Sequence, residues 1–406
     1  MSSHWLSLEE ALTKALDAAK AIADTEQVST FDANNRVLAQ DVIAHIDVPP
    51  WNNSAMDGYA INVEDLKDDC SPRLEVQGVI TAGMKADEPL QKGKAFKIMT
   101  GAPMPANANA VVMVENTSSE NGAVLINKVP RLQENIRKKA NDIACGDTLI
   151  SKGTRLHAEH LMLLSSQGSS TVEVFRKLRV GVVATGSELA APGETREATQ
   201  IFESNRVGVS SILQNENVEL IDFGIVADDE ASLRALFVEA SERVDVMVSS
   251  GGVSVGDADY VKDIIAELGA IDFWKVAVKP GKPFALGQIN NALFCGLPGN
   301  PVSSFVTAKL LVVPIIKKMQ GESKVHEPFL VNASITTSLK RRAGRRDFQR
   351  ATMVKNAQGG WDVTPFKTQS SGVMTSITSA NCLMIVHENV SELKKGDTVQ
   401  VMPLHF

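Results

Sequence analysis

The hydrophobic and polar positions of the chain follow different patterns in its successive parts. Ser7 and Glu10 have the spacing of a capping box, and the apolar residues after them predict an amphipathic N-terminal helix. Residues 36–178 carry short apolar runs between turn-forming clusters, which predicts β-rich structure with one short helix over residues 158–167.

A regular alternation of strand and helix patterns begins at Arg179. Residues 179–185 form an apolar run typical of a strand buried on both faces of a parallel sheet. Further strands are predicted over residues 218–226, 245–250, 271–278, 283–289 and 292–297, and helices over residues 205–215, 230–243, 260–268 and 301–319. The alternation predicts a doubly wound α/β domain with right-handed crossovers. Short apolar runs return in residues 327–406 and predict a small C-terminal β domain.

Length and composition limit the class of protein. A chain of 406 residues exceeds the size of one hydrophobic core, so several domains are expected. A net charge of −7 argues against general nucleic-acid binding, and no apolar run approaches the roughly 20 residues that span a bilayer. Four widely separated cysteines favour a reducing compartment over a disulfide framework. We therefore expect a soluble, cytoplasmic protein that binds neither nucleic acid nor a membrane.

Polar loops follow the predicted strands of the α/β domain at the points where the strands end. They span residues 185–188, 228–229, 250–259, 279–283 and 296–301. The carboxyl ends of strands in an open α/β sheet are the usual place for a ligand. These loops therefore predict one shared binding site.

The loop over residues 250–259 has the chemistry of a phosphate and cation site. Its glycines let backbone N–H groups approach a ligand, and Asp257 and Asp259 supply the hard oxygen ligands that Mg²⁺ prefers. An aspartate ahead of a helix is also an ordinary helix cap, but Glu188 on the same edge of the sheet favours the metal.

Lys275, Lys279 and Lys282 form a basic cluster with no acidic residue between them, which predicts a negatively charged ligand. A solvated edge of the sheet is the alternative. Arg341 and Arg342, in contrast, are expected on a solvated face of the C-terminal domain.

Residues 49–60 (PPWNNSAMDGYA) place several hydrogen-bonding side chains between two aromatic residues. Such a stretch suits a plain turn and a heterocycle-binding or acid–base site equally well, so the pattern leaves both open. Other sites are excluded more firmly, because the chain has no Walker motif, no dinucleotide fingerprint and no cysteine or serine with a base nearby.

Segments along the whole chain resemble one known family. They are residues 53–60 (NSAMDGYA), 98–103 (IMTGAP), 249–259, 279–283, 296–303, 344–350 (GRRDFQR) and 370–372. From about residue 6 to residue 404 the chain resembles the molybdopterin molybdenumtransferase family, the molybdenum-insertion enzymes of cofactor biosynthesis related to the E domain of gephyrin.

The resemblance implies a reaction and an architecture. Molybdenum from molybdate would be inserted into adenylylated molybdopterin with the help of Mg²⁺ or another divalent cation, and AMP would be released. The subunits would form a homodimer, and contact with the molybdopterin adenylyltransferase, whose fold the α/β domain resembles, is compatible with this reaction. The implied domains are a connecting domain (residues 1–46 and 142–177), a β-rich lobe (47–141), the α/β domain (178–326) and a C-terminal β-barrel-like domain (327–406).

The resemblance also assigns roles to single residues. The catalytic candidates are Asp57, Thr100, Glu188, Asp228 and Asp259. The substrate-binding candidates are Arg137, Asp142, Ser250, Gly251, Gly252, Pro298 and Pro301. The molybdate-binding candidates are Lys275, Lys279, Lys282, Ser303, Arg350 and Ser371, and the metal candidates are Glu188, Asp257 and Asp259. The chain departs from residues common in the family at Asn141, Ser187 and Glu203.

Two other functions stay open on the sequence. An adenylyltransferase would share the α/β fold but would not need the N-terminal and C-terminal domains. A non-enzymatic scaffold of the gephyrin kind would not need the acidic and basic loops.

Overall fold

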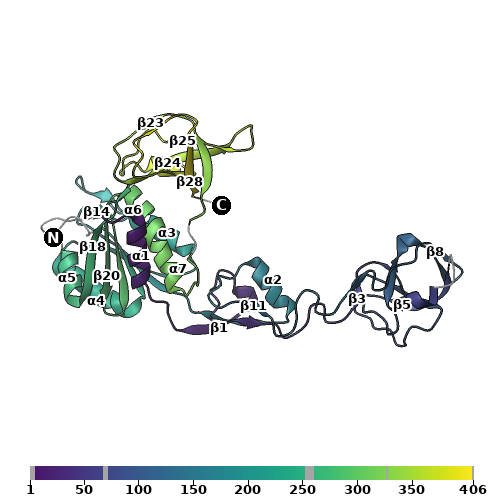
Figure 1. Ribbon diagram of the computed structural model, residues 1–406. Helices are drawn as coiled ribbons and strands as arrows, with labels where there is room; N and C mark the ends of the chain where they lie inside the picture. Colours follow the sequence, from purple (N-terminus) through teal and green to yellow (C-terminus); the bar gives the residue numbers. More distant parts are fainter. Residues whose placement is uncertain (1–4, 67–71, 252–259, 326–327, 405–406) are drawn as a thin grey trace. The chain divides into compact units, whose positions relative to one another are not determined.

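The computed structural model describes residues 5–66, 72–251, 260–325 and 328–404, which divide into two compact units. One unit comprises Met1–Gln40, Lys152–Leu161 and Thr171–Phe406, and the other comprises Asp41–Ser151 and Met162–Ser170. Figure 1 shows the helices and strands of both. The four predicted domains do not coincide with these two units, because the predicted connecting domain has residues in both, and they stay a prediction.

A six-stranded sheet in the order β16-β13-β17-β21-β20-β18 forms the centre of the first unit. Its strands are β13 (Arg179–Thr185), β16 (Glu219–Val226), β17 (Val246–Ser250), β18 (Gly269–Lys275), β20 (Pro283–Ile289) and β21 (Ala292–Leu297). β16, β13, β17 and β21 are parallel, whereas β20 runs antiparallel to β21 and β18. The sheet is therefore mixed, and β18 ends at the same edge as the four parallel strands.

The strand predicted over residues 271–278 is wrong in its extent. β18 ends at Lys275, and Val278–Lys279 forms a separate short strand, β19, that belongs to another sheet. The apolar pattern continues through Val276 and Val278 because both side chains are buried, although the chain has left the first sheet.

Helices cover both faces of the six-stranded sheet, as predicted for a doubly wound domain (Figure 1). The helices are α4 (Glu230–Arg243) and α5 (Tyr260–Leu268) on one face, and α1 (Leu8–Ala18), α3 (Asn205–Gln214), α6 (Pro301–Thr307) and α7 (Val313–Met319) on the other. Val183 packs with Phe237 in the first core and Val182 with Ile315 in the second, since successive side chains of a strand point to opposite faces. A π-helical turn, Ala308–Val312, joins α6 to α7.

The predicted capping box at the start of α1 is confirmed. Ser7 N–H donates to Glu10 Oε2 at 2.7 Å, and Glu10 N–H donates to Ser7 Oγ at 3.1 Å. These two bonds satisfy backbone donors that the first helical turn leaves free.

The C-terminal residues form a small barrel. β24 (Arg346–Lys355), β25 (Trp361–Pro365), β22 (Val331–Ile335), β28 (Thr398–Pro403) and β26 (Cys382–Val386) pair in this order, and β26 pairs back with β24. β19 joins β24 in parallel, with Val278 opposite Arg346 and Lys279 opposite Asp347. The barrel edge is thereby continuous with a loop of the α/β domain.

The second unit is β-rich, as predicted. Its main sheet has the order β7-β4-β6-β5-β9-β8. The strands are β4 (Gly58–Ile61), β5 (Arg73–Ile80), β6 (Lys94–Ile98), β7 (Ala110–Met113), β8 (Thr117–Glu120) and β9 (Ala123–Ile126). Tyr59 and Ile61 face one apolar core and Ala60 faces another, so both sides of β4 are buried.

The remaining elements are short. They are β1 (Thr25–Ser29) paired with β12 (Thr171–Phe175), β2 (Val42–Ile43) with β11 (Thr148–Ile150), β3 (Asn53–Ser54) with β10 (Ile136–Arg137), β14 (Leu189–Ala190) with β15 (Ile201–Phe202), β23 (Leu339–Lys340) with β27 (Glu392–Leu393), and the helices α2 (Ala158–Ser166) and α8 (Thr375–Thr378). No helix in the described ranges has the length and hydropathy needed to cross a membrane.

Buried charges hold the start of the six-stranded sheet. Asp245 precedes β17 and accepts hydrogen bonds from Arg176 Nη1 and Nη2 at 2.7 and 2.9 Å and from the Arg179 N–H at 2.8 Å. Burial would raise the pKa of Asp245, but the hydrogen bonds from both arginines outweigh it and lower the pKa to about 2. Arg176 also contacts the exposed Asp24 at 3.0 Å.

We predict that Asp245→Asn lowers the free energy of unfolding by about 2 kcal/mol at neutral pH, because it removes the ion pair and leaves Arg176 partly buried. The lowered pKa means that the carboxylate stabilises the fold above its ordinary value near 3.8, and that this contribution is lost as the pH falls through about 2. The melting temperatures of the two proteins should therefore converge over this range. Asp24→Asn is the matched control and should change the melting temperature by no more than about 1–2 °C. Equal losses from both variants would contradict the assignment.

Candidate active site

A cleft of about 780 Å³ opens at the edge where β13, β16, β17, β18 and β21 end. Each of the five polar loops predicted from the sequence contributes residues to its walls, which confirms that they share one edge. The barrel adds Arg345 and the segment Gln369–Ser371. The cleft therefore combines two folded parts of the first unit.

Two neighbouring aspartates after β16 have different roles. Asp229 accepts a hydrogen bond from the Ser232 N–H at 3.0 Å and caps α4. Asp228 lines the cleft together with Glu188. Burial raises the pKa of Asp228, and the negative charge of Glu188 raises it further. Asp228 and Glu188 therefore form an acidic pair that faces the cleft, and their negative charges repel each other.

Gly251 brings two loops of the cleft together. Its φ of +96° lies in the left-handed region, and a Cβ at this position would approach the Thr185 carbonyl oxygen to 2.5 Å. Only glycine allows this contact between the loops that follow β13 and β17.

Two of the three predicted metal ligands, Asp257 and Asp259, lie outside the described residues, as does the substrate-binding candidate Gly252. Within the described ranges, no three His, Cys, Asp or Glu side chains gather into a group that could hold a metal ion. Glu188 and Asp228 fit the chemistry of a divalent cation, since both are hard oxygen donors at one cleft and a cation would relieve their repulsion. The ligand oxygens of a bound phosphate would have to complete such a site.

The basic side of the cleft contains Lys279, Lys282, Ser303 and Ser371, four of the six predicted molybdate-binding residues. Lys275 and Arg350 are not among the residues that line it. Ser303 is buried in α6 and lines the cleft.

The expectation that the lysine cluster has no acidic partner is wrong for Lys279. Its Nζ lies 3.3 Å from Asp347 Oδ2, because β19 pairs with β24. Asp347 is almost fully buried, whereas Lys279 keeps 41% of its side chain exposed. The acid comes from a point about 70 residues further along the chain, where no local pattern could reveal it.

Arg350 is fully buried behind the serine segment of the cleft. Its Nη2 donates to the Ser370 carbonyl at 3.1 Å and its Nε to Ser376 Oγ at 3.0 Å. Nη1 is buried and has no hydrogen-bond partner among the described residues. Burial lowers the pKa of Arg350, and the charge of Asp347 opposes this effect. The guanidinium therefore fixes the position of the Ser370 backbone and keeps one donor unused.

The expectation of a solvated face is wrong for Arg341. Its side chain is only 6% exposed, and its Nη2 donates to the Arg345 carbonyl at 2.6 Å. It supports the turn that carries Arg345 into the cleft. Arg342 is exposed, as predicted.

Other substrate-binding candidates of the first unit are placed differently. Pro298 and Gly251 line the cleft. Ser250 is buried at the end of β17, and Pro301 begins α6 beside a small apolar pocket.

Four of the predicted site residues lie in the second unit, namely Asp57, Thr100, Arg137 and Asp142. Asp57 Oδ1 accepts hydrogen bonds from the Thr100 N–H at 2.7 Å and from Thr100 Oγ1 at 2.8 Å. These two bonds, the backbone one first, lower the pKa of Asp57. Arg137 lies opposite Asn53 in the β10–β3 pair, and Asp142 is exposed in a turn. The Asp57 carboxylate is therefore oriented by Thr100 and ionised at neutral pH.

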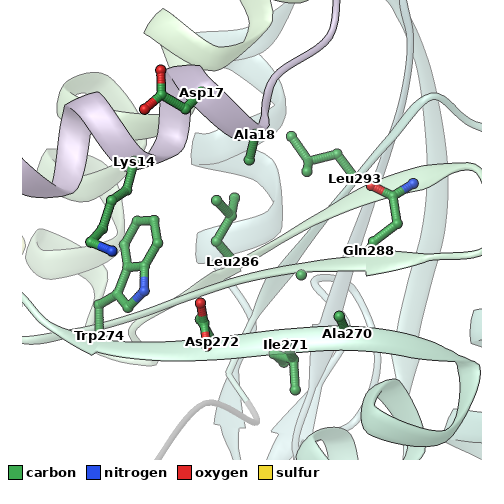
Figure 2. A pocket seen from close by; sticks show the side chains of 11 residues that line it. Lys14, Asp17, Ala18, Ala270, Ile271, Asp272, Trp274, Leu286, Gln288 and Leu293 are labelled. Atoms are coloured by element: carbon green, nitrogen blue, oxygen red, sulfur yellow. The ribbon is translucent and has the colours of Figure 1, made fainter.

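Another cavity, of about 370 Å³, lies between α1 and the outer strands β18 and β20. Figure 2 shows Lys14 and Trp274 at one end and Gln288 and Leu293 at the other, with Leu286 between them. None of the described residues predicted for the site lines this cavity, so the cleft at the carboxyl edge is the candidate active site.

Three family models match the chain in the order of its sequence. They are described as the MoeA N-terminal region (domain I and II) over residues 6–168, a probable molybdopterin binding domain over residues 181–318, and the MoeA C-terminal region (domain IV) over residues 332–404. The molybdopterin molybdenumtransferase of Haemophilus influenzae is 39% identical over 401 residues, which cover 98% of this chain and 99% of that protein. The chain belongs to the molybdopterin molybdenumtransferase family.

Further members agree with this membership. The molybdopterin molybdenumtransferase of Bacillus subtilis is 34% identical over 387 residues, covering 93% of this chain and 90% of that protein. A solved structure of the molybdopterin biosynthesis moeA protein from Pyrococcus horikoshii OT3 matches with a TM-score of 0.84 at 28% identity, over 98% of this chain and 100% of that chain. As a member of the molybdopterin molybdenumtransferase family, the chain is an enzyme of molybdenum cofactor biosynthesis, which confirms the predicted family, fold class and enzyme class.

The sequence analysis missed three residues of the cleft. Arg345, Gln369 and Ile201 line the cleft without having been assigned a role. Arg345 stands in the GRRDFQR segment of the molybdopterin molybdenumtransferase family resemblance, so that segment was the available signal.

We predict that Glu188→Gln and Asp228→Asn each weaken Mg²⁺ binding about tenfold in a calorimetric titration, because each removes one charged oxygen ligand. Asp229→Asn is the matched control: it should leave Mg²⁺ affinity unchanged and cost no more than about 1 kcal/mol of stability as a cap. Because the pKa of Asp228 is raised, Mg²⁺ affinity should begin to fall at a higher pH than an ordinary aspartate would give. Equal weakening by Asp229→Asn would contradict the acidic pair as the cation site.

Proposed function

We propose that the chain inserts molybdenum from molybdate into adenylylated molybdopterin and releases AMP. The observation that carries this proposal is the presence of an acidic pair and a basic group at one cleft of about 780 Å³, a volume typical of small-molecule sites. The acidic pair suits a cation bound to phosphate, and the basic group suits a compact dianion. The proposal includes a cytoplasmic homodimer as the active form, as the family resemblance implies.

The acidic pair would act on the pyrophosphate of the substrate. Glu188 and Asp228, with Asp257 and Asp259, are the residues that would hold Mg²⁺ beside the phosphate oxygens. When bound, the cation supplies electrostatic stabilisation of the phosphoryl group and of the leaving AMP. An oxygen of water or of molybdate would add to the phosphorus on the pterin side, the bond from this phosphorus to the bridging oxygen would break, and AMP would leave with that oxygen and the electron pair. If water is the nucleophile, a base would take its proton.

The basic group would hold molybdate. Lys279 and Lys282 supply positive charge, and the hydroxyls of Ser303 and Ser371 supply donors to its oxygens. Arg350 lies behind the serines, where it holds the Ser370 carbonyl and retains an unpartnered Nη1. An anion that reaches Nη1 would satisfy this donor, whose isolation costs about 1–3 kcal/mol.

The second unit would supply an acid–base group. Asp57 is ionised at neutral pH and is oriented by two bonds from Thr100, so it can accept a proton at its free carboxylate oxygen. Arg137 and Asp142 are the proposed ligand contacts of the same unit.

The function is tested by incubating the full chain with adenylylated molybdopterin, Mg²⁺ and molybdate. AMP should be released in amounts equal to the molybdenum inserted, and release should depend on molybdate. A parallel incubation with ATP and free molybdopterin separates the adenylyltransferase alternative, because only that enzyme would accumulate adenylylated pterin. AMP release at the same rate without molybdate would contradict the insertion reaction.

We predict that Arg350→Ala lowers the affinity for molybdate at least about tenfold, since it removes a charged donor and frees the Ser370 backbone. The measurement is a calorimetric titration of the full chain with molybdate alone. Lys355→Ala, at a cation of the same strand that contacts Trp361, is the matched control and should bind molybdate normally. Unchanged affinity in Arg350→Ala would remove Arg350 from the oxyanion site.

A further inference from the structure

The first described residue of the chain contacts the cleft. Trp5 is 37% exposed, and its ring centroid lies 5.3 Å from Lys282 Nζ and 5.9 Å from Arg345 Cζ. Both cations line the cleft, and both distances are those of cation–π interactions. One indole ring therefore contacts two cations of the cleft. Together with Lys279 they form what we call its basic wall.

The backbone fixes this arrangement around the segment Val276–Ala277. Four main-chain hydrogen bonds join residues 275–277 to the segments that carry Trp5, Lys282 and Arg345. The Leu6 N–H donates to the Lys275 carbonyl (3.0 Å), and the Ala277 N–H donates to the Leu6 carbonyl (2.8 Å). The Val276 N–H donates to the Lys282 carbonyl (2.9 Å), and the Arg346 N–H donates to the Ala277 carbonyl (2.8 Å). Trp5 precedes Leu6 and Arg345 precedes Arg346. Leu6, Arg346 and Lys282 all take part in these hydrogen bonds. The three side chains are thus brought together by the fold and not by side-chain conformation alone.

The two cations at Trp5 differ from their neighbours in charge compensation. Lys279 is paired with Asp347, and Arg346 is paired with Glu9 and Glu388. Lys282 and Arg345 form no ion pair with any residue in the described part of the chain. A carboxylate partner would cancel most of their charge, whereas an aromatic ring orients a cation and leaves its charge in place. A cation held in this way keeps its full attraction for an anion.

We propose that Arg345 is an oxyanion-binding residue of the cleft and that Trp5 is a positioning residue that orients Arg345 and Lys282 toward the anion. The ligand class is a tetrahedral oxyanion, either molybdate or a phosphate of the nucleotide substrate. The planar guanidinium matches two oxygens of such an anion at once. The identity of the anion rests on the proposed function, but its binding can be measured without turnover.

The test is a pair of calorimetric titrations of the full chain, one with molybdate and one with AMP, at low ionic strength. Arg345→Ala should weaken at least one of the two anions about tenfold or more, and Arg345→Lys should weaken it less. A loss in the molybdate titration assigns the wall to the metal oxyanion, and a loss in the AMP titration assigns it to the nucleotide phosphate.

Trp5 is tested by a readout that a merely structural role would not move. Trp5→Ala should weaken the same anion about three- to tenfold with both cations still present, and Trp5→Phe should restore most of the affinity because its ring also attracts cations. Anion binding should change the indole fluorescence of the unmodified chain and leave that of Trp5→Phe unchanged.

Two variants control for general effects. Arg342→Ala removes an exposed cation near Arg345 in sequence that does not line the cleft. Trp361→Phe alters another tryptophan that contacts a cation, Lys355 at 5.7 Å, away from the cleft. Both should bind molybdate and AMP as the unmodified chain does.

Unchanged affinity for both anions in Arg345→Ala, at an unchanged melting temperature, would overturn the proposal. So would equal weakening by Trp5→Ala and Trp5→Phe, because the ring would then have no orienting role. Failure of the proposed function has a different signature: the unmodified chain would release no AMP, while anion binding that depends on Trp5 and Arg345 would persist.

Discussion

The pairing of β19 with β24, over two residues of each strand, holds the candidate site together. Because Val278 lies opposite Arg346 and Lys279 opposite Asp347, the loop after β18 and strand β24 of the barrel form one continuous edge. The ion pair of Lys279, the turn that carries Arg345 and the buried Arg350 all depend on this register. Because β24 is also held by β25 and β26, a shift by one residue would turn the side chains of β19 to the opposite face, and Lys279 would point away from Asp347.

The cleft keeps charges of both signs without cancelling them. Glu188 and Asp228 repel each other, and Lys282 and Arg345 are held by an aromatic ring in place of a carboxylate. In most proteins such groups pair with each other, because isolated charges near a folded interior are costly. Their separation in one cleft favours a substrate system that brings a cation and an anion at the same time. Unpaired charges in the cleft lower the stability of the fold, whereas paired networks such as the one around Asp245 raise it.

Much of the fold could be predicted, because the elements of the α/β domain have local causes. The run over residues 179–185 became β13 with the same bounds, and the polar loops met at one edge because parallel strands end there. The failures involve tertiary contacts that the local sequence pattern does not reveal. Lys279 gained Asp347, Arg341 was buried by carbonyl oxygens of its own barrel, and the strand over residues 271–278 was divided because its second half pairs with β24. Nothing around Trp5 in the sequence marks it as a contact of cleft residues, since its two cations come from other segments.

The contacts of Trp5 also set an order of assembly. The acidic pair is built from segments 40 residues apart, so it can form as soon as the middle of the chain has folded. The basic wall requires Trp5 and Arg345, which are 340 residues apart in the sequence and whose segments are joined through Val276–Ala277 and through the ion pair of Glu9 with Arg346. Contacts of such long sequence separation form late, and during synthesis they must wait for the last domain to leave the ribosome. A nascent or truncated chain would therefore acquire the acidic pair first and the complete basic wall last.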